Sequence, residues 1–458
     1  MSENSNNMLV ILLVVGLVVG ASAGYMLAPK KKGTTVTKEV KVPGETITKT
    51  ETIIEYVTKA PLDGKTIQIG NIYSNDANLE TVEPLMMDII MPEINDYLGM
   101  LGYDVELEFL NDNAMESAAI HLEKVQGFHA IGVDLIIGGR WSSQAQGAKS
   151  YVDDNDMLLF SPSSTSPMVA IPNDNVYRMC PTDVVQAAAI AEMLNTWGIE
   201  ALAVIQRVDP WADGIYNLLV GETGGGELAE RGIETKASWR LSYDPTSKEF
   251  ASDLETLEGI AKELVAEVGA EKAAVLVVGF NEVAVMISQA SDYDTLYNQV
   301  QWFGTDGTAI SQRLRDDSPT EAAHLLIPST LAAPGVSPKF RALNASYFPL
   351  VGQVLGYYSA TTYDIAWVLT QAVLETQGVD AKAIIPFIDP ISANHYGASG
   401  WNKLNPDGDR FPPDYEIWGY GLRGAGTDHV KYGDFYTFDE SVEWLTSALG
   451  FTPPGLEG

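Results

Sequence analysis

The sequence predicts an α/β protein in which parallel sheets are covered by helices, arranged as two doubly wound lobes. From about residue 65 onward, short apolar runs alternate with segments of helical periodicity, the pattern of parallel strands joined by crossover helices. The chain has 458 residues, which exceeds one ordinary core and leaves room for two lobes and additional segments.

Composition narrows the function classes. The chain has 61 acidic and 28 basic residues, a net charge of −33 that would repel phosphate backbones and argues against nucleic-acid binding. It is 46% hydrophobic, enough to bury substantial cores. The single cysteine, Cys180, excludes an internal disulfide and a cysteine-based zinc site. The five histidines are scattered, so we expect no catalytic metal and no cofactor.

The N-terminus predicts a membrane segment followed by a stalk. Met8–Ala28 carries no charge and is long enough to span a bilayer as a helix. The alternative is a cleaved signal peptide, because Ala21–Ala23 fits the small-residue cleavage pattern. Lys30–Lys32 favours a cytoplasmic downstream chain, yet we expect a folded domain outside the cell, membrane-anchored or secreted. Gly33–Ala60 alternates charged with β-branched residues, as a solvated stalk would.

The first set of elements begins near Lys65 and alternates strands with helices. Two neighbouring apolar runs, Leu135–Ile137 and Met157–Phe160, each lead into a cluster of small hydroxyl residues. The set consists of strand TIQIGNIYS, helix Leu79–Met100, strand VELEFLNDN, helix Ser117–Phe128, strand VDLIIGG and the stretch Ile136–Pro167.

These two hydroxyl turns predict half of a binding site. Ligands of open parallel sheets bind beyond the carboxyl ends of the strands, and N–H groups at helix starts suit a carboxylate or phosphate. Ser142 stands at such a start, where the alternative role is a helix cap. The second turn, SPSSTSP, adds further hydroxyls, and Arg140 lies near enough to act as a charge partner.

The second set, after Pro181, offers three more turns at strand ends. Trp211 follows the strand ALAVI, Phe280 follows AAVLVVG, and Asp306 follows QWFG. Buried aromatic residues more often fill a core than line a site, and an acidic residue at a helix start is more often a cap. Asp306, between a strand end and Gly307, is expected to project into a cleft and pair with a ligand ammonium.

The order and spacing of these turns resemble a known family. The segments IIGGRWSSQAQ, MLLFSPSSTSP, DPWADG, VVGFNE and WFGTDG, with NDNAMESAAIHLEKV and YYSATTYDIAWVLTQAV, look like the type I periplasmic substrate-binding proteins of branched-chain amino acid ABC transporters. The resemblance covers about residues 65–425 and implies two α/β lobes joined by three crossovers, which close on a ligand around a hinge.

The resemblance also assigns roles to the first-lobe turns. Ser142 and Thr165 match the hydroxyls that hold a ligand α-carboxylate in the family, and Ser163 matches the position that does so through its backbone.

The second-lobe positions match with departures. Asp306 matches the acidic residue that takes the α-ammonium, but the family has Glu there. Trp211 and Phe280 match aromatic positions, with Trp211 in place of a frequent Tyr, and Asn75 and Asp76 replace an apolar lining. We therefore expect an amino acid, an amide or another small amphoteric solute.

Two further patterns carry less weight. Asn405–Glu416 has oxygens at the spacing of a calcium loop, but Arg410 occupies the required glycine position, so a hairpin turn is the better interpretation. Asn344 heads an Asn-Ala-Ser glycosylation triplet, usable only if the domain is exported.

These observations favour an extracytoplasmic solute-binding protein that delivers its ligand to an ABC permease. One alternative is an extracellular sensor that acts through a partner membrane protein. The other is an enzyme, but the sequence shows no pair of nucleophile and base and no phosphate loop. The predicted organisation is 1–29 anchor or signal, 30–64 stalk, 65–180 with 331–390 first lobe, 181–330 with 391–425 second lobe, and 426–458 C-terminal extension.

Overall fold

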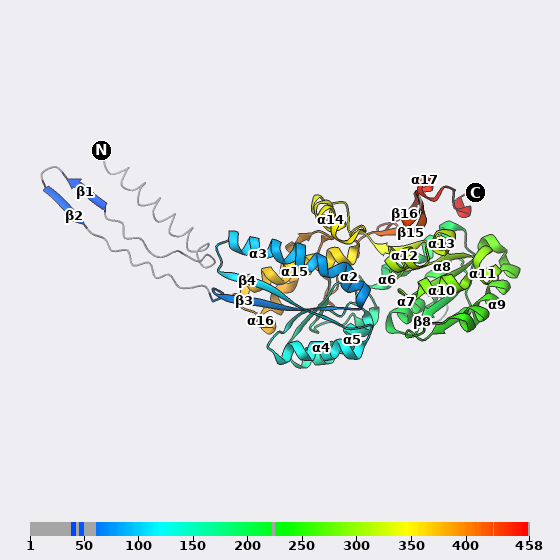
Figure 1. Cartoon of the computed structure of the whole chain (residues 1–458), viewed down its shortest axis with the longest axis horizontal. Coiled ribbons are helices and arrows are strands. Elements are labelled where there is room, and N and C mark those ends of the chain that lie inside the picture. Colours follow the sequence, from blue (N-terminus) through cyan, green and yellow to red (C-terminus); the bar gives the residue numbers. More distant parts are fainter. Residues whose placement is uncertain (1–37, 43–44, 50–60, 222–224, 425, 457–458) are drawn as a thin grey trace.

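The computed structural model describes residues 38–42, 45–49, 61–221, 225–424 and 426–456 (Figure 1). The predicted span Met8–Ala28 lies outside these ranges, and no helix within them has the length and apolarity to cross a membrane. Inside the predicted stalk, β1 (Lys38–Val42) and β2 (Glu45–Lys49) form an antiparallel pair. Leu62 is already buried in the first core, so the folded domain begins slightly before the predicted Lys65.

The first lobe is built on a five-stranded parallel sheet in the order β4-β3-β5-β6-β7. The elements of this lobe are β3 (Lys65–Tyr73), α2 (Asp76–Pro84), the π-helical turn η1 (Leu85–Ile90), α3 (Met91–Met100), β4 (Val105–Asn113), α4 (Ala118–Ala130), β5 (Leu135–Ile137), α5 (Ser142–Asp154), β6 (Leu158–Ser161), η2 (Pro167–Val169), β7 (Val176–Arg178), α14 (Pro338–Val351), α15 (Tyr357–Thr376), α16 (Ala381–Asn394), β13 (Tyr396–Gly397) and β14 (Gly400–Trp401).

Each face of this sheet carries its own core, because side chains alternate along a strand. Ile67 and Ile69 of β3 pack against α2, η1, α3, α15 and α16. Ile72, on the opposite face, packs with Val125 of α4 and Ala148 of α5. Figure 1 shows α4 and α5 on one side of the sheet and α2, α3 and α15 on the other, which is the predicted doubly wound arrangement.

The second lobe combines a parallel sheet, β11-β10-β8-β9, with an antiparallel one, β12-β15-β16-β17. A single parallel bridge between Gly304 and Ser329 links the two. The elements of this lobe are α6 (Asp183–Trp197), β8 (Ala201–Arg207), α7 (Pro210–Val220), α8 (Glu227–Glu230), η3 (Ala237–Trp239), β9 (Arg240–Tyr243), α9 (Ala251–Val268), η4 (Ala270–Lys272), β10 (Ala273–Val278), α10 (Val283–Ala290), α11 (Asp294–Asn298), β11 (Gln301–Phe303), α12 (Gln312–Asp317), α13 (Pro319–Leu325), β12 (Ser329–Ala332), β15 (Tyr415–Arg423), β16 (Gly426–Tyr436), β17 (Ser441–Trp444), α17 (Thr446–Leu449) and η5 (Pro454–Leu456).

The chain passes between the lobes three times, after β7, after β12 and before β15. A small apolar cluster lies at these passages and includes Cys180, Leu331, Tyr357 and Tyr415. The single cysteine is therefore a packing residue at the hinge, and burial raises the pKa of its thiol.

The structure differs from two predicted boundaries. The first part of the predicted second-lobe range 391–425 belongs to the first lobe, because Ala398 and Leu404 pack in the first core, whereas β15 lies in the second lobe as predicted. Asp409 forms a bidentate ion pair with the buried Arg178, with Nη2 and Oδ2 2.7 Å apart. In the turn with the spacing of a calcium loop, the Asp409 carboxylate therefore binds an arginine side chain. The C-terminal extension is part of the second lobe, because β16 and β17 extend its sheet.

Candidate functional site

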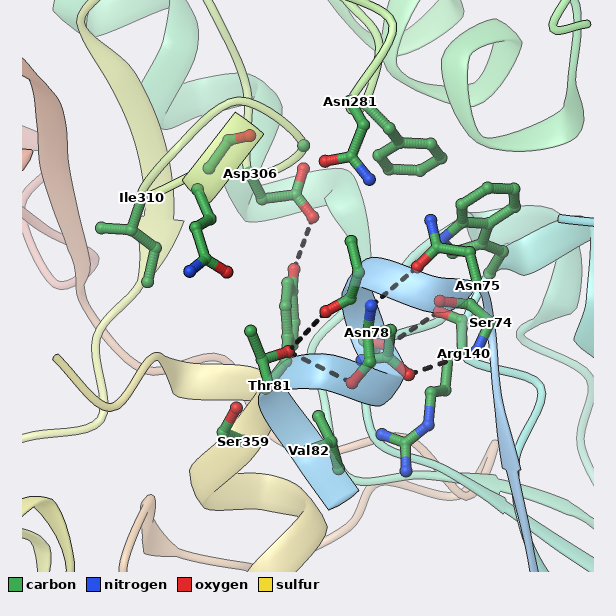
Figure 2. A pocket seen from close by; sticks show the side chains of 18 of the residues that line it. Ser74, Asn75, Asn78, Thr81, Val82, Arg140, Asn281, Asp306, Ile310 and Ser359 are labelled. Carbon is green, nitrogen blue, oxygen red and sulfur yellow. Dashed lines mark hydrogen bonds between the residues drawn. The ribbon is translucent and has the colours of Figure 1, made fainter. Parts of the chain in front are cut away.

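A cavity of about 220 Å³ lies between the lobes at the carboxyl ends of their parallel strands. This volume is below the roughly 300–1,000 Å³ of drug-sized ligand sites, so it suits a small solute. Its polar and aromatic lining includes Ser74, Asn75, Asn78, Thr81, Arg140, Trp141, Ser142, Ser163 and Tyr358 from the first lobe, and Trp211, Phe280, Asn281, Asp306 and Gln312 from the second (Figure 2).

The two hydroxyl turns lie side by side in the first lobe. Ser142 is the first residue of α5, and its Oγ accepts the backbone N–H of Ser166 at 3.1 Å. Ser163 donates its hydroxyl to the carbonyl of Arg140 at 2.8 Å. Trp141 takes the N-cap position, so Ser142 joins the two turns rather than capping its helix.

Thr165 is the predicted site residue that does not line the cavity. It is buried, and its carbonyl accepts the N–H of Asp183 at the start of α6, 2.9 Å away. Thr165 thus anchors the passage into the second lobe, whereas Ser142 and Ser163 lie at the cavity wall.

Asp306 faces the cavity from the end of β11. One carboxylate oxygen accepts the phenol hydroxyl of Tyr358 at 2.5 Å, and the other accepts the side-chain amide of Gln186 at 2.8 Å. Desolvation by burial raises the pKa of Asp306 above the usual value of an aspartate. Burial likewise raises the pKa of neighbouring Asp183, and the negative charge of Asp306 adds to this rise.

Arg140 brings a buried positive charge beneath the opposite wall. Its guanidinium donates to three neutral acceptors, the carbonyl of Ile72 at 3.1 Å, Oδ1 of Asn71 at 2.9 Å and Oγ1 of Thr362 at 2.9 Å. It forms no salt bridge with any described residue, although only 3% of its surface is exposed. Burial lowers the pKa of Arg140 to about 10, so the group remains charged at neutral pH.

The same burial keeps a neighbouring imidazole neutral. His121 accepts the backbone N–H of Gly139 at Nε2, 2.7 Å away. Burial, with the positive charge of Arg140 as a smaller cause, lowers the pKa of His121 to about 3. Of these two buried groups, Arg140 therefore carries a positive charge at neutral pH and His121 does not.

Three aromatic rings cross from one lobe to the other. Phe280 stacks on Trp211 with ring centroids 4.5 Å apart and on Trp141 with centroids 4.7 Å apart. The guanidinium of Arg207 lies 4.5 Å from the Phe280 centroid and 4.9 Å from that of Trp141. Because Trp141 belongs to the first lobe and Phe280 to the second, the stack holds the lobes together.

Helix α2 supplies a polar face of which the sequence prediction named only Asn75 and Asp76, and Asp76 is not part of the lining of this cavity. Asn75 caps this helix, its Oδ1 accepting the N–H of Asn78 at 2.8 Å. Thr81, one turn further on, returns its hydroxyl to the carbonyl of Ala77 at 3.0 Å. Figure 2 shows Asn75, Asn78 and Thr81 along the helix beside the cavity, opposite Asn281 and Asp306.

The structure places five of the six predicted site residues around one cavity: Ser142, Ser163, Trp211, Phe280 and Asp306. The sequence prediction missed Trp141, Asn78 and Tyr358. Trp141 directly precedes the predicted Ser142, so its position at the strand end was the available signal. Within the described chain, no group of three or more acidic, histidine or cysteine side chains is placed to hold a metal ion.

The family profile described as Receptor family ligand binding region matches residues 87–422. A curated relative, an uncharacterised protein of Methanocaldococcus jannaschii, is 26% identical over 279 residues, which are 58% of this chain and 63% of that protein. The chain therefore spans less than two thirds of the length of that relative.

Solved structures share the fold. A leucine-binding protein, LivK, of Thermotoga maritima has a TM-score of 0.67 and 19% identity over 81% of this chain and 99% of its own. LivJ of Streptococcus pneumoniae, solved with isoleucine, has a TM-score of 0.63 and 15% identity over 80% of this chain and 100% of its own. A solute-binding protein of Rhodopseudomonas palustris, solved with 3,4-dihydroxybenzoic acid, has a TM-score of 0.61 and 14% identity over 83% and 99%.

Proposed function

The chain belongs to the receptor family of ligand-binding regions, with the type I periplasmic binding protein fold, and from this premise we propose that it captures a small amino acid or amide-like solute between its lobes. It hands the solute to an ABC permease and performs no chemistry on it. The N-terminal segment Met8–Ala28 holds the folded domain outside the cell membrane, or is cleaved to release it.

The observation that carries this proposal is the separation of charge across the cavity. Arg140, beneath one wall, has a buried positive charge without a carboxylate partner among the described residues, while Asp306 on the other wall has a carboxyl group desolvated by burial. Burying an isolated charge is costly unless it is paired. A zwitterion with its carboxylate towards Arg140 and Ser142 and its ammonium towards Asp306 offsets both costs.

Several of the structural relatives are named for, or solved with, amino acids of the same class as the proposed solute. A leucine-binding protein and an isoleucine complex are among them, and the ABC transporter assignment of such proteins supports a permease as partner. The aromatic wall of Trp211 and Phe280 adds surface against the body of the ligand.

A thermal-shift screen of the full chain in mild detergent against amino acids and simple amides tests the proposal. At a ligand concentration of about 100 times Kd, binding to the folded state contributes about 2.7 kcal/mol and raises Tm by roughly 3–4 °C. A panel of dicarboxylates, sugars and aromatic acids serves as the control. Absence of any shift with amine- or amide-bearing solutes, together with a shift in the control panel, would overturn the proposed ligand class.

A further inference from the structure

A second cavity of about 400 Å³ adjoins the first and is also lined by both lobes. The two cavities share Asn75, Ala77 and Asn281 as wall residues. These three residues therefore lie at the boundary between the two cavities.

The second cavity is rich in charged side chains of both signs. Within the described chain, Arg207 pairs with Glu282 at 2.8 Å, whereas Lys248 and Glu116 take part in no salt bridge. The Glu116 carboxylate accepts a weak hydrogen bond from the Asn75 amide at 3.4 Å. Although Met115, Pro245 and Val285 also line this cavity, its charged side chains suit a group that forms hydrogen bonds.

Two of the residues at the boundary between the cavities are amides. The Asn75 oxygen is committed to capping α2, whereas the side chain of Asn281 makes no hydrogen bond with any residue in the described part of the chain. Figure 2 shows Asn281 beside Asp306, with its amide directed into the cavity. Asn281 therefore has both an N–H and a carbonyl oxygen available to a ligand.

Part of the aromatic surface of the first cavity is already covered by side chains of the protein. Trp141 and Trp211 both stack on the ring of Phe280, and the guanidinium of Arg207 lies 4.5 Å from its centroid. The apolar side chains Val82 and Ile310 lie away from Asn281 in Figure 2. The boundary between the two cavities thus consists of two amides and one alanine.

Building on the proposed function, we propose that the solute is longer than a branched-chain amino acid and ends in an amide-bearing chain, up to the length of a dipeptide. Its carboxylate and ammonium occupy the first cavity. Its amide passes Asn281, which donates to and accepts from it, and its far end enters the second cavity near Lys248 and Glu116. The selectivity then differs from that of the leucine- and isoleucine-binding proteins of the same fold.

Isothermal titration calorimetry on the full chain with leucine, glutamine and alanylglutamine tests this inference. We expect glutamine and alanylglutamine to bind at least tenfold more tightly than leucine. Asn281→Leu should weaken binding of the two amides about five- to tenfold and leave that of leucine nearly unchanged. Asn281→Ala removes the amide without adding apolar atoms and gives the same comparison, and Asn298→Leu, the same substitution on the exposed surface of α11, serves as the matched control.

The outcomes separate this inference from the proposed function. Leucine binding as tightly as glutamine and alanylglutamine would overturn the inference and leave the proposed function standing. An equal loss for all three ligands in both Asn281 variants would also overturn it. If none of the three binds, while a solute without an amino or amide group does, both the proposed function and the inference fall.

Discussion

Replacing Asp306 by Asn removes the charge that we assign to the ligand ammonium while keeping the size of the side chain. In the parent protein, the Tyr358 hydroxyl and the Gln186 amide donate to the two carboxylate oxygens. In the variant, the Asn oxygen can still accept from the Gln186 amide, and the Asn amide nitrogen can donate to the Tyr358 hydroxyl oxygen. We therefore expect the free protein to fold. The interaction removed from the complex is a hydrogen bond to a charged group, worth about 1.5–3 kcal/mol.

That free energy corresponds to a roughly 10- to 150-fold loss of affinity for amine-bearing solutes. Isothermal titration calorimetry with the best ligand of the thermal-shift screen measures it. Asp389→Asn, on the exposed side of α16, changes the same group outside the site and should leave affinity unchanged. An Asp306→Asn protein that binds amines as tightly as the parent would refute the ammonium role.

The pH dependence gives a second measure of the same group. Burial raises the pKa of Asp306 in the folded protein above that of the unfolded chain. At a pH between these two pKa values, the Asp306 carboxyl group is protonated in the folded state and ionised in the unfolded state. The free protein should lose stability as pH rises through this window. An ammonium ligand needs the ionised carboxylate, so its affinity should rise with pH over the same window, and Asp306→Asn should flatten this rise.

Three further perturbations test the surroundings of the site. Asp409→Ala leaves the buried Arg178 without its partner and should cost about 3–5 kcal/mol in urea unfolding; a loss below about 1 kcal/mol would contradict this. Trp141→Ala removes the ring stacked on Phe280 and weakens the attraction between the lobes by about 0.5–1.5 kcal/mol. The variant should therefore show a larger radius of gyration of the free protein in X-ray scattering. An unchanged scattering profile would contradict a role of this stack in holding the lobes together. Arg140→Gln should weaken the binding of carboxylate ligands more than Arg140→Lys does. Equal losses of affinity in the two variants would contradict the role of the Arg140 charge in binding the ligand carboxylate.

Much of the fold follows from local patterns in the sequence. Strand β4 (Val105–Asn113) coincides with the predicted run VELEFLNDN, and α4 (Ala118–Ala130) covers most of the predicted helix Ser117–Phe128. The residues at strand ends converge because carboxyl ends of parallel strands meet at one edge of a sheet. Ser142, Phe280 and Asp306 were accessible to prediction for that reason.

The remaining features depend on how distant segments pack. Tyr358 lies 52 residues beyond Asp306 in the chain, and no local pattern predicts the hydrogen bond between them. Thr165 shares the hydroxyl turn of Ser163, yet its side chain lies beneath the turn because its backbone is held by Asp183. Composition alone does not distinguish a hydroxyl at the cavity wall from one beneath it.

The contacts of Asp306 also connect ligand charge to the arrangement of the lobes. Gln186 belongs to the second lobe and Tyr358 to the first, so this one carboxyl group joins both sides of the cleft at the cavity edge. In the free protein, the hydrogen bonds from these two donors stabilise the ionised form of the Asp306 carboxyl group, which burial disfavours. A ligand ammonium would stabilise the ionised carboxylate further, and because the stabilised group contacts both lobes, binding would favour the arrangement in which they are closed. The same charge that selects the solute thereby favours closure around it.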